Sequence, residues 1–356
     1  MEISIKLTKN LKPHPDDSNL PFGSIFTDHM FIMNYSPEKY WHNPRIEPYS
    51  SIMMDPAAMV LHYGQAVFEG LKAFRTKSDT IVLFRAKDNF KRMNKSAKSL
   101  CIPEFDESFL LSALKKLLSI EKDWIPKSHG TSLYIRPTII GTDPYLGVRA
   151  SYTYQLFIIL SPVGAYYSEG FNPVKIWVTK DYVRTVRGGL GEAKTPANYA
   201  ASLYAGEEAH KSGYTQVLWL DGIMQNYIEE VGSMNIFFVI DGELITPELT
   251  GSILPGITRD SVIALAKLWK IPVAERRISI DEVIDAHNSN KLQEVFGSGT
   301  AAVISPVEEI KYNDKILKIG DGKVGPMANK FFKSIIDLQY GNTKEDPFGW
   351  IETVDV

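Results

Sequence analysis

Apolar residues recur along the chain at two different spacings. Over residues 90–100 and 110–117 they lie three or four positions apart, which predicts two helices that each bury one face. Residues 68–75 and 81–84 are two candidate strand segments that flank a polar stretch at 76–79. A short polar segment between two such runs is typical of a β-hairpin. The first part of the chain is therefore expected to mix strands with helices.

Two segments of the second half carry helix-start signals. Thr195 precedes Pro196, and a capping residue followed by proline predicts the first turn of a helix. This helix is expected to end at Gly213. Ser279 is followed three residues later by Glu282, which predicts a second helix that starts with a capping box.

Apolar stretches with turn residues between them predict further strands. We expect strands at residues 132–140, 154–160 and 174–179. In the second half, Asp221–Gly222 and Asp241–Gly242 each follow an apolar run, and an Asp-Gly pair favours a tight hairpin turn.

These elements predict an α+β protein with two domains. Residues 161–164 and 169–173 are rich in turn formers, so we expect a linker at 163–175. It would join an N-terminal mixed α/β domain at 1–162 to a C-terminal mixed α/β domain at 176–356. The regular strand–helix alternation of a doubly wound sheet is absent from the pattern.

Composition agrees with a soluble globular protein and disfavours several other classes. A length of 356 residues fits two domains at about 150 residues each, and the net charge of −3 suggests no nucleic-acid partner. No apolar run approaches the ~20 residues of a membrane span, and residues 1–8 lack a signal-peptide core. Cys101 is the single cysteine, and no two histidines have the spacing of a helical metal pair. We expect a cytoplasmic protein without a metal or a membrane partner.

Lys194 is the candidate for amine chemistry. It follows a segment with three glycines at 188–191 and directly precedes the predicted helix start. Positive potential at a helix N-terminus lowers the pKa of a lysine, and a neutral amine is the form that reacts with an aldehyde. The alternative is an ordinary solvated lysine in a loop.

Glu229 and Glu230 are candidates to pair with a buried cation such as a protonated pyridine. In an extended segment they point to opposite faces, so only one of them can meet such a ring. The alternative for either residue is a carboxylate at the surface end of a strand.

Two glycine-containing loops are candidates to bind phosphate or carboxylate groups. Residues 254–260 place a glycine turn directly before a helix, and free N–H groups at a helix start bind anions. Residues 297–300 form a Gly-Ser-Gly-Thr segment after a predicted strand. The alternative is an ordinary helix start at the first place and a plain turn at the second. The segment lacks the third glycine of a dinucleotide fingerprint, which disfavours a nicotinamide dehydrogenase.

Taken in order, the motifs resemble those of the branched-chain aminotransferases among the fold-type IV pyridoxal-phosphate enzymes. The resemblance spans nearly the whole chain. It implies the two-domain architecture of the D-amino-acid aminotransferase-like fold, with the Schiff-base lysine in the C-terminal domain. The matching segments are residues 61–64, 67–70, 134–137, 187–200, 230–235, 254–256 and 296–301.

The resemblance implies pyridoxal 5′-phosphate as cofactor and assigns residues to it. Lys194 would carry the cofactor as a Schiff base, and Glu230 rather than Glu229 would pair with the ring nitrogen. Arg92 would bind the phosphate, although helical periodicity alone places Arg92 on the solvent face. The remaining implied cofactor contacts are Tyr199, for the 3′-oxygen, and Ile257, Thr258 and Thr300, for the phosphate.

The resemblance also implies a pocket for two kinds of substrate. Tyr63, Phe68 and Tyr134 would surround an apolar side chain, and Arg136 with Tyr63 would receive the γ-carboxylate of glutamate. Leu146 and Val148 would reach the site of a neighbouring subunit, which implies a homodimer or a higher homo-oligomer. Ser233, Thr300 and Ala301 complete the implied substrate contacts, the last two through backbone N–H groups.

The implied reaction is a ping-pong transamination between L-leucine, L-isoleucine or L-valine and 2-oxoglutarate. It gives branched-chain 2-oxo acids and L-glutamate. The alternatives are a D-amino-acid aminotransferase or an aminodeoxychorismate lyase of the same fold, and a non-catalytic phosphate-binding dimer.

Overall fold

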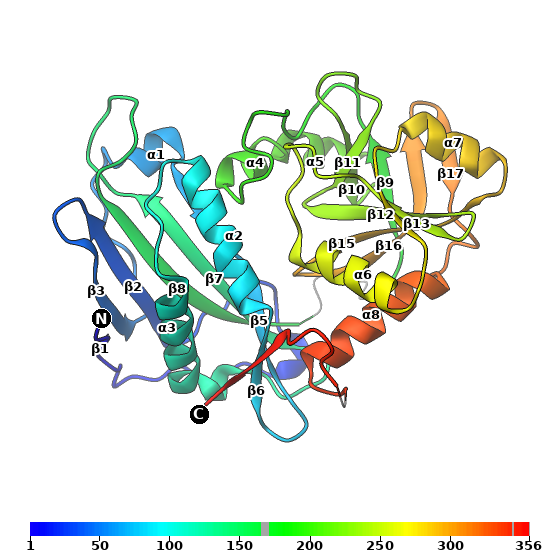
Figure 1. The fold of residues 1–356 in the computed structure, drawn as a ribbon. Helices are drawn as coiled ribbons and strands as arrows, with labels where there is room; N and C mark the ends of the chain where they lie inside the picture. The colour runs from blue at the N-terminus through cyan, green and yellow to red at the C-terminus, as the bar shows by residue number, and fades with distance from the viewer. Residues whose placement is uncertain (165–170, 344, 356) are drawn as a thin grey trace. The chain divides into compact units, whose positions relative to one another are not determined.

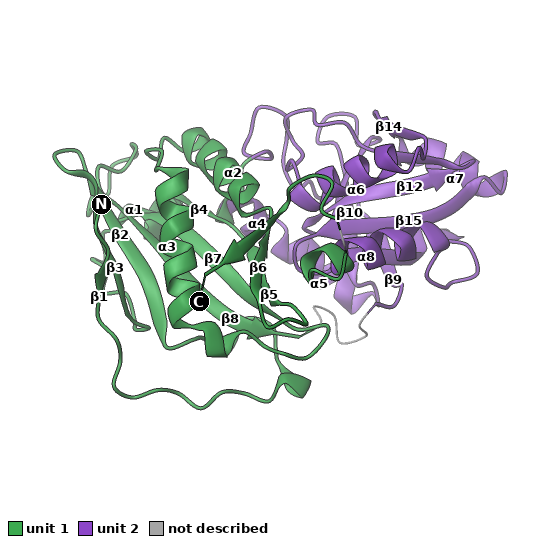
Figure 2. Cartoon of the chain, turned by 60° about the horizontal axis from the view of Figure 1, so that its bottom comes forward, with its two compact units in different colours: residues 1–166, 193–196, 337–356 green, residues 167–192, 197–336 purple. Residues whose placement is uncertain are grey.

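The computed structural model describes residues 1–164, 171–343 and 345–355. The chain divides into two compact units, coloured separately in Figure 2. The N-terminal unit comprises residues 1–166, 193–196 and 337–356, and the C-terminal unit comprises residues 167–192 and 197–336. This division differs from the expected boundaries, because residues 193–196 and 337–356 return to the N-terminal unit. Residues 165–170 of the expected linker lie outside the described residues.

A mixed sheet forms the centre of the N-terminal unit (Figure 1). Its strands follow the order β1-β3-β2-β8-β7-β5-β6-β18, and β4 pairs with β7. The expected strands 132–140 and 154–160 are β7 and β8, and the expected hairpin is β5 with β6. The strand bounds are β1 (Ser4–Ile5), β2 (His29–Ser36), β3 (Tyr40–Pro48), β4 (Ala66–Phe68), β5 (Leu71–Arg75), β6 (Ile81–Phe84), β7 (Ser132–Gly141), β8 (Tyr154–Val163) and β18 (Ile351–Val354).

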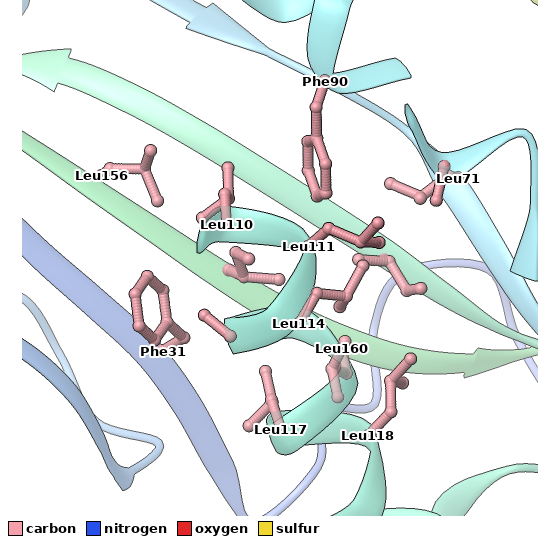
Figure 3. Close-up of a cluster of buried hydrophobic side chains, with 14 of the residues drawn as sticks. Phe31, Leu71, Phe90, Leu110, Leu111, Leu114, Leu117, Leu118, Leu156 and Leu160 are labelled. Atoms are coloured by element: carbon pink, nitrogen blue, oxygen red, sulfur yellow. The ribbon is translucent and has the colours of Figure 1, made fainter. Parts of the chain in front are cut away.

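The two predicted helices of the first half are present as α2 (Ala86–Ser99) and α3 (Glu107–Ile120). A short helix, α1 (Met59–Tyr63), precedes β4. Figure 3 shows the leucines of α3 directed toward side chains of the sheet and toward Phe90 of α2. Burial of this apolar surface, at about 25 cal/mol per Å², fixes the helices on one face of the sheet.

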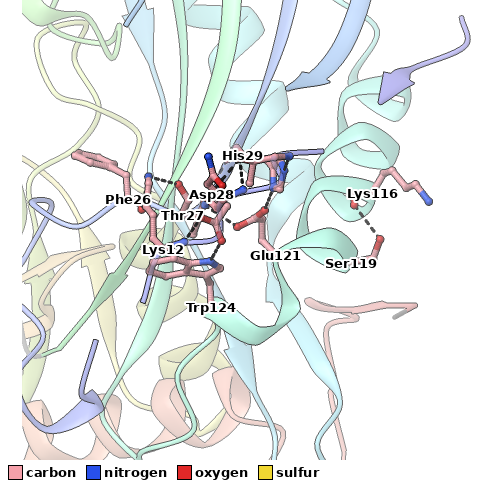
Figure 4. A network of polar contacts seen from close by, with 11 residues as sticks. Lys12, Phe26, Thr27, Asp28, His29, Lys116, Ser119, Glu121 and Trp124 are labelled. Carbon is pink, nitrogen blue, oxygen red and sulfur yellow. Dashed lines mark hydrogen bonds and ion pairs between the residues drawn. The ribbon is translucent and has the colours of Figure 1, made fainter. Parts of the chain in front are cut away.

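A buried polar network anchors the end of α3 to the start of β2 (Figure 4). Glu121 accepts hydrogen bonds from His29 Nδ1 and from the backbone N–H of Asp28. Asp28 in turn accepts a 2.8 Å bond from the indole of Trp124, and His29 Nε2 accepts one from the backbone of Thr8. Burial raises the pKa of Glu121. The network satisfies polar groups that would otherwise destabilise this part of the core.

Six strands of the C-terminal unit form a closed ring of pairings. They follow the order β11-β10-β9-β16-β15-β12, and the additional pairing of β11 with β12 closes the ring. A closed sheet has no unpaired edge, so its backbone polar groups are satisfied. The strand bounds are β9 (Val174–Val178), β10 (Gln216–Leu220), β11 (Ile228–Val231), β12 (Met234–Ile240), β13 (Glu243–Thr246), β14 (Val273–Glu275), β15 (Leu292–Gly299), β16 (Val303–Tyr312) and β17 (Lys315–Lys318).

The structure confirms one hairpin turn and one helix cap that were predicted in the second half of the chain. Asp241 and Gly242 both have positive φ and connect the antiparallel strands β12 and β13. Ser279 caps a helix by accepting a hydrogen bond from the backbone of Glu282. The helices are α4 (Pro196–Ala200), α5 (Leu203–Lys211), α6 (Ile257–Leu268), α7 (Ile280–Asn288) and α8 (Pro326–Gln339).

Two local predictions are wrong. The single helix expected from Thr195 to Gly213 is divided into α4 and α5, because Ser202 donates both its backbone N–H and its hydroxyl to the carbonyl of Tyr199. The connection that starts at Asp221 is also longer than a two-residue hairpin. Asp221 accepts hydrogen bonds from four backbone N–H groups of residues 223–227, so its side chain organises a wider loop.

Both sheets combine parallel and antiparallel pairs, and helices accompany both, which confirms the predicted α+β class. Among the described residues, no helix is both long and apolar enough to cross a membrane.

Candidate active site

The backbone of Lys194 is fixed by hydrogen bonds within the N-terminal unit. Its N–H donates to the hydroxyl of Ser96 on α2 at 2.9 Å, and its carbonyl accepts from the N–H of Phe68 on β4 at 3.0 Å. The hydroxyl of Thr195, predicted as a helix cap, instead donates to the carbonyl of Ala66 at 2.9 Å. Lys194 is therefore held on both sides by elements of the sheet and of α2.

The amine of Lys194 lies over an aromatic ring that also faces an arginine. Lys194 Nζ is 4.8 Å from the ring centroid of Phe68, and the guanidinium of Arg136 is 4.7 Å from the same centroid. Arg136 also donates to the hydroxyl of Tyr134 at 3.0 Å. Cation–π attraction favours the position of the Arg136 guanidinium over this ring. The structure thus brings together four of the residues that the sequence assigned to the site.

Arg92 is buried, so the solvent position expected from helical periodicity is wrong. Its Nε and Nη2 lie 2.7 and 2.9 Å from the two carboxylate oxygens of Glu69. Arg92 is 8% exposed and Glu69 is fully buried. Sequence reasoning missed Glu69, although a carboxylate in an otherwise apolar strand region signals a buried partner.

Gly70 lies between Glu69 and the start of β5, where a larger side chain would have no room. A Cβ at Gly70 would lie 2.1 Å from the hydroxyl oxygen of Tyr134. The N–H of Gly70 also donates to Glu69 at 3.1 Å. The predicted strand 68–75 is therefore interrupted here, with β4 ending at Phe68 and β5 starting at Leu71.

The loop between β7 and β8 exposes the apolar side chains that were expected to reach a neighbouring subunit. Leu146 is 61% exposed and Val148 is 85% exposed. The hydroxyl of Tyr63 donates to the carbonyl of Leu146, so this tyrosine contacts the loop through the backbone.

Glu230 is buried in the C-terminal unit and pairs with an arginine that sequence reasoning missed. Glu230 is 3% exposed, and its Oε2 lies 2.6 Å from Nε of Arg184. Its Oε1 accepts longer bonds, at 3.3 Å, from the side chain of Asn235 and the backbone of Leu254. The alternative of a carboxylate at the surface is wrong for this residue.

Glu229 is also buried, at 6% exposure, and makes different contacts. Its Oε1 accepts a hydrogen bond from the hydroxyl of Ser252. Burial raises the pKa of Glu229, while this hydrogen bond and the charge of Arg184 partly oppose the rise. The adjacent carboxylates therefore differ in environment, since Glu230 is in direct contact with a cation.

Asn235 connects three of the predicted site elements, and sequence reasoning missed it too. It pairs with Glu230 across β11 and β12, and with Ser298 across β12 and β15. Its side chain donates to the carbonyl of Leu254 at 2.9 Å, and a Cβ at Gly256 would lie 2.0 Å from its oxygen. The carboxylate, the start of α6 and the glycine-containing strand thus converge within the C-terminal unit.

The two predicted anion loops have geometry that suits a phosphate or carboxylate group. Helix α6 starts after Gly256, which has no side chain to cap it, and the N–H groups at a helix start suit an anion. Strand β15 continues through Gly299, so the turn begins at Thr300 rather than at the first glycine. Among the described residues, the hydroxyl of Ser298 is buried without a hydrogen-bond partner.

The remaining predicted residues lie at less enclosed positions. Tyr199 lies on α4 and is partly exposed, and Ser233 is exposed in the turn between β11 and β12. Thr300 and Ala301 are both half-buried.

No group of three or more metal-ligating side chains occurs among the described residues. A cavity of about 670 Å³ in the C-terminal unit is lined by residues such as Gln293, Lys323 and Met327, and by none of the predicted site residues. Glu294 at this cavity accepts hydrogen bonds from the first turn of α8, so its carboxylate has a structural role.

Comparisons with known proteins agree on one family. Residues 66–310 match the model of the amino-transferase class IV family. The chain is 57% identical to branched-chain-amino-acid aminotransferase 2 of Bacillus subtilis, over 99% of this chain and 97% of that one. It is 54% identical to branched-chain-amino-acid transaminase 1 of the same organism, over 99% of both chains.

Solved structures show the same relationship. The branched-chain amino acid aminotransferase of Escherichia coli superposes with a TM-score of 0.77 and 30% identity, over 92% of this chain and 99% of that one. The T.th. branched-chain amino acid aminotransferase, solved with N-(5′-phosphopyridoxyl)-L-glutamate, gives a TM-score of 0.75 and 28% identity. That comparison covers 91% of this chain and 98% of the T.th. chain.

Proposed function

The chain belongs to the branched-chain aminotransferases of the class IV aminotransferase family, and we propose that it uses pyridoxal 5′-phosphate to exchange amino groups. The proposed substrates are L-leucine, L-isoleucine and L-valine on one side and 2-oxoglutarate on the other. The products are branched-chain 2-oxo acids and L-glutamate. The ligand of the T.th. relative, which joins the pyridoxyl phosphate group to glutamate, supports this choice of cofactor and of acceptor.

The observation that carries the proposal is the fixed position of Lys194. The backbone of Lys194 is held by Ser96 and Phe68, and its amine lies over the ring of Phe68. Orientation of this kind is what a covalent amine catalyst requires.

Each of the two units contains groups that suit a part of pyridoxal phosphate. An amine, a buried carboxylate and the start of a helix match its aldehyde, its ring nitrogen and its phosphate, respectively. When bound, the cofactor supplies an aldehyde that captures amines and a ring that stabilises negative charge on the substrate.

We assign the cofactor contacts by that match. Lys194 would hold the aldehyde carbon, Glu230 the protonated ring nitrogen and Tyr199 the 3′-oxygen. Arg92 would bind the phosphate, and its buried carboxylate partner Glu69 fixes the guanidinium in one orientation. Backbone N–H groups of Ile257, Thr258 and Thr300 would bind the remaining phosphate oxygens.

Lys194 would also act as general base once substrate has displaced it. It would move the proton from the Cα of the amino acid to C4′ of the cofactor, and in the opposite direction in the second half-reaction. The ring of Phe68 shields one side of this amine, which limits the access of water. Glu230 would keep the proton on the ring nitrogen throughout.

The substrate side combines apolar and cationic groups. Phe68 and Tyr134 would contact the apolar side chain, and Arg136, with Tyr63, would bind the glutamate γ-carboxylate in the same space. Arg136 suits both tasks because its charged guanidinium lies over the rings of Phe68 and Tyr134. Backbone N–H groups of Thr300 and Ala301 would bind the substrate α-carboxylate, and Ser233 would line the pocket.

We also propose a homodimer. Leu146 and Val148 expose apolar side chains on the loop between β7 and β8, and a second copy of the chain would cover them. Sedimentation of the purified protein tests this assignment, and a monomer at micromolar concentration would contradict it.

One experiment tests the central proposal. The purified holoprotein is assayed with L-leucine and 2-oxoglutarate, and a parallel sample is reduced with borohydride and mapped by peptide mass. We expect turnover and a single phosphopyridoxyl adduct, on Lys194. The variant Lys194→Ala should lose both. Turnover with D-amino acids, an adduct elsewhere, or bound cofactor without turnover would each overturn the proposal.

A further inference from the structure

Arg184 occupies a buried position where three elements of the C-terminal unit meet. Its side chain is 7% exposed, and its Nε lies 2.6 Å from Oε2 of Glu230. Its Nη2 donates to the carbonyl of Ser252 at 2.7 Å and to the carbonyl of Gly191 at 3.3 Å. One guanidinium therefore contacts a buried carboxylate and two backbone segments that are distant in sequence.

The two segments touch at the point where Arg184 joins them. A Cβ at Gly191 would lie 2.2 Å from the carbonyl oxygen of Ser252, so only glycine permits this approach. Gly191 precedes Lys194 by three residues, and Ser252 precedes the first residue of α6 by five. The arginine thus links the segments that lead to the candidate amine and to the candidate phosphate site.

Burial makes the charge of Glu230 dependent on a partner. A carboxylate removed from water takes up a proton unless a cation or several hydrogen bonds stabilise its charged form. The two hydrogen bonds to Oε1 of Glu230 are both 3.3 Å long, which is at the long and weak end of the distances found for N–H···O hydrogen bonds. A guanidinium stays charged at every pH at which proteins are folded, so the contact with Arg184 is the constant source of stabilisation.

A neutral Glu230 would serve the cofactor poorly. A protonated carboxyl offers a hydrogen to the ring nitrogen instead of accepting one, so the ring would lose its positive charge and stabilise less negative charge on the substrate. A carboxylate accepts about four hydrogen bonds, so pairing with Arg184 still permits a contact with the ring.

We propose that Arg184 is a positioning residue that keeps Glu230 ionised and oriented toward the ring nitrogen of pyridoxal phosphate. This inference rests on the proposed role of Glu230. Arg184 acts through that carboxylate and, through the carbonyls of Gly191 and Ser252, holds the two neighbouring segments in register with it.

The test follows the proton on the ring nitrogen directly. The holoprotein is loaded with pyridoxal phosphate labelled with ¹⁵N in the ring, and the nitrogen chemical shift is recorded across the pH range of stability. In the wild type the nitrogen should stay protonated. In Arg184→Gln it should lose its proton at a pH at least about one unit lower, because the neutral side chain no longer stabilises the Glu230 anion.

Matched variants separate this role from a structural one. Arg187→Gln removes an exposed arginine from the same loop and should leave the nitrogen titration unchanged. In a Glu230→Gln background, Arg184→Gln should cause no further shift in the titration, because the carboxylate through which it acts is gone. A further shift of the same size in that background would overturn the proposal.

Arg184→Lys provides a second variant if the neutral substitution does not fold. Unlike arginine, lysine loses its charge at alkaline pH, so the ring nitrogen should lose its proton at a lower pH than in the wild type. If the ring nitrogen of Arg184→Lys and of Arg184→Gln titrates at the same pH as in the wild type, the arginine only supports the fold. This conclusion holds whatever the change in melting temperature.

The wild type and Glu230→Gln distinguish failure of this inference from failure of the proposed function. A wild-type protein that does not retain the cofactor would overturn both. The other case has three observations. The ring nitrogen is protonated in the wild type, loses its proton in Glu230→Gln, and titrates in Arg184→Gln as it does in the wild type. This result would overturn only the role of Arg184.

Discussion

Substitution of Glu69 by glutamine should destabilise the apoprotein strongly, although Glu69 is not expected to touch substrate. Glu69 is fully buried and both of its oxygens contact Arg92, at 2.7 and 2.9 Å. Glutamine has nearly the same shape but no charge, so it removes the negative charge that contacts the buried guanidinium. Loss of one partner of a buried ion pair costs about 3–5 kcal/mol.

That cost predicts a large fall in melting temperature. For a cooperative unit of 150–250 residues, 1 kcal/mol corresponds to about 2–4 °C, so the melting temperature should fall by roughly 6–20 °C. Pyridoxal phosphate should restore part of the loss, because its phosphate would supply Arg92 with a new counterion. The cofactor should therefore stabilise the variant more than it stabilises the wild type.

Calorimetry of the apoprotein and holoprotein measures both effects. Glu104→Gln is the matched control, because Glu104 is an exposed glutamate of the same unit. Its melting temperature should stay within about 1 °C of the wild type, as is usual for surface substitutions. The reasoning is refuted if Glu69→Gln melts no lower than this control, or if the cofactor stabilises both proteins equally.

Three further predictions test the candidate site and its surroundings. Glu230→Gln should lower the rate of transamination about 10- to 100-fold, as expected for loss of a charge-assisted hydrogen bond, and far more than Glu229→Gln; equal losses would contradict the assignment. Arg136→Ala should slow the half-reaction with glutamate more than that with leucine in single-turnover measurements, since only glutamate carries a γ-carboxylate; a uniform loss would indicate a structural role. Burial lowers the pKa of Lys72 from 10.5 to about 8, so the cost of burying its charge is complete below pH 8 and disappears as the pH rises toward 10.5. In urea titrations over that window, the wild type should therefore gain about 3 kcal/mol relative to Lys72→Met, and a constant difference would refute this.

Local signals identified most helices and hairpins correctly because each depends on a few neighbouring residues. The apolar spacing in α2 and α3, the Asp241–Gly242 turn and the cap at Ser279 are of this kind. The divided helix after Pro196 was missed, because Ser202 competes for a backbone carbonyl that a regular helix would use differently.

Some site residues were likewise marked by local signals in the sequence, and others were not. Lys194 and the anion loops stood out because glycine and helix-start signals surround them in the sequence. Arg184 and Asn235 did not, because no local pattern marks an arginine or an asparagine that acts on a distant carboxylate. Helical periodicity even placed Arg92 in solvent, since it measures the polarity of a side chain and takes no account of a buried partner.

The sequence by itself determined the class of the fold, most of its elements and the family to which the chain belongs. The spacing of apolar residues, the residues of turns and the order of motifs can all be read from neighbouring positions, so they do not depend on how the chain folds in three dimensions. Only the tertiary structure decided which charges face one another: Arg92 with Glu69 across 23 positions, and Arg184 with Glu230 across 46. A buried charge is stable only beside its counterion, and folding alone brings such distant residues within reach.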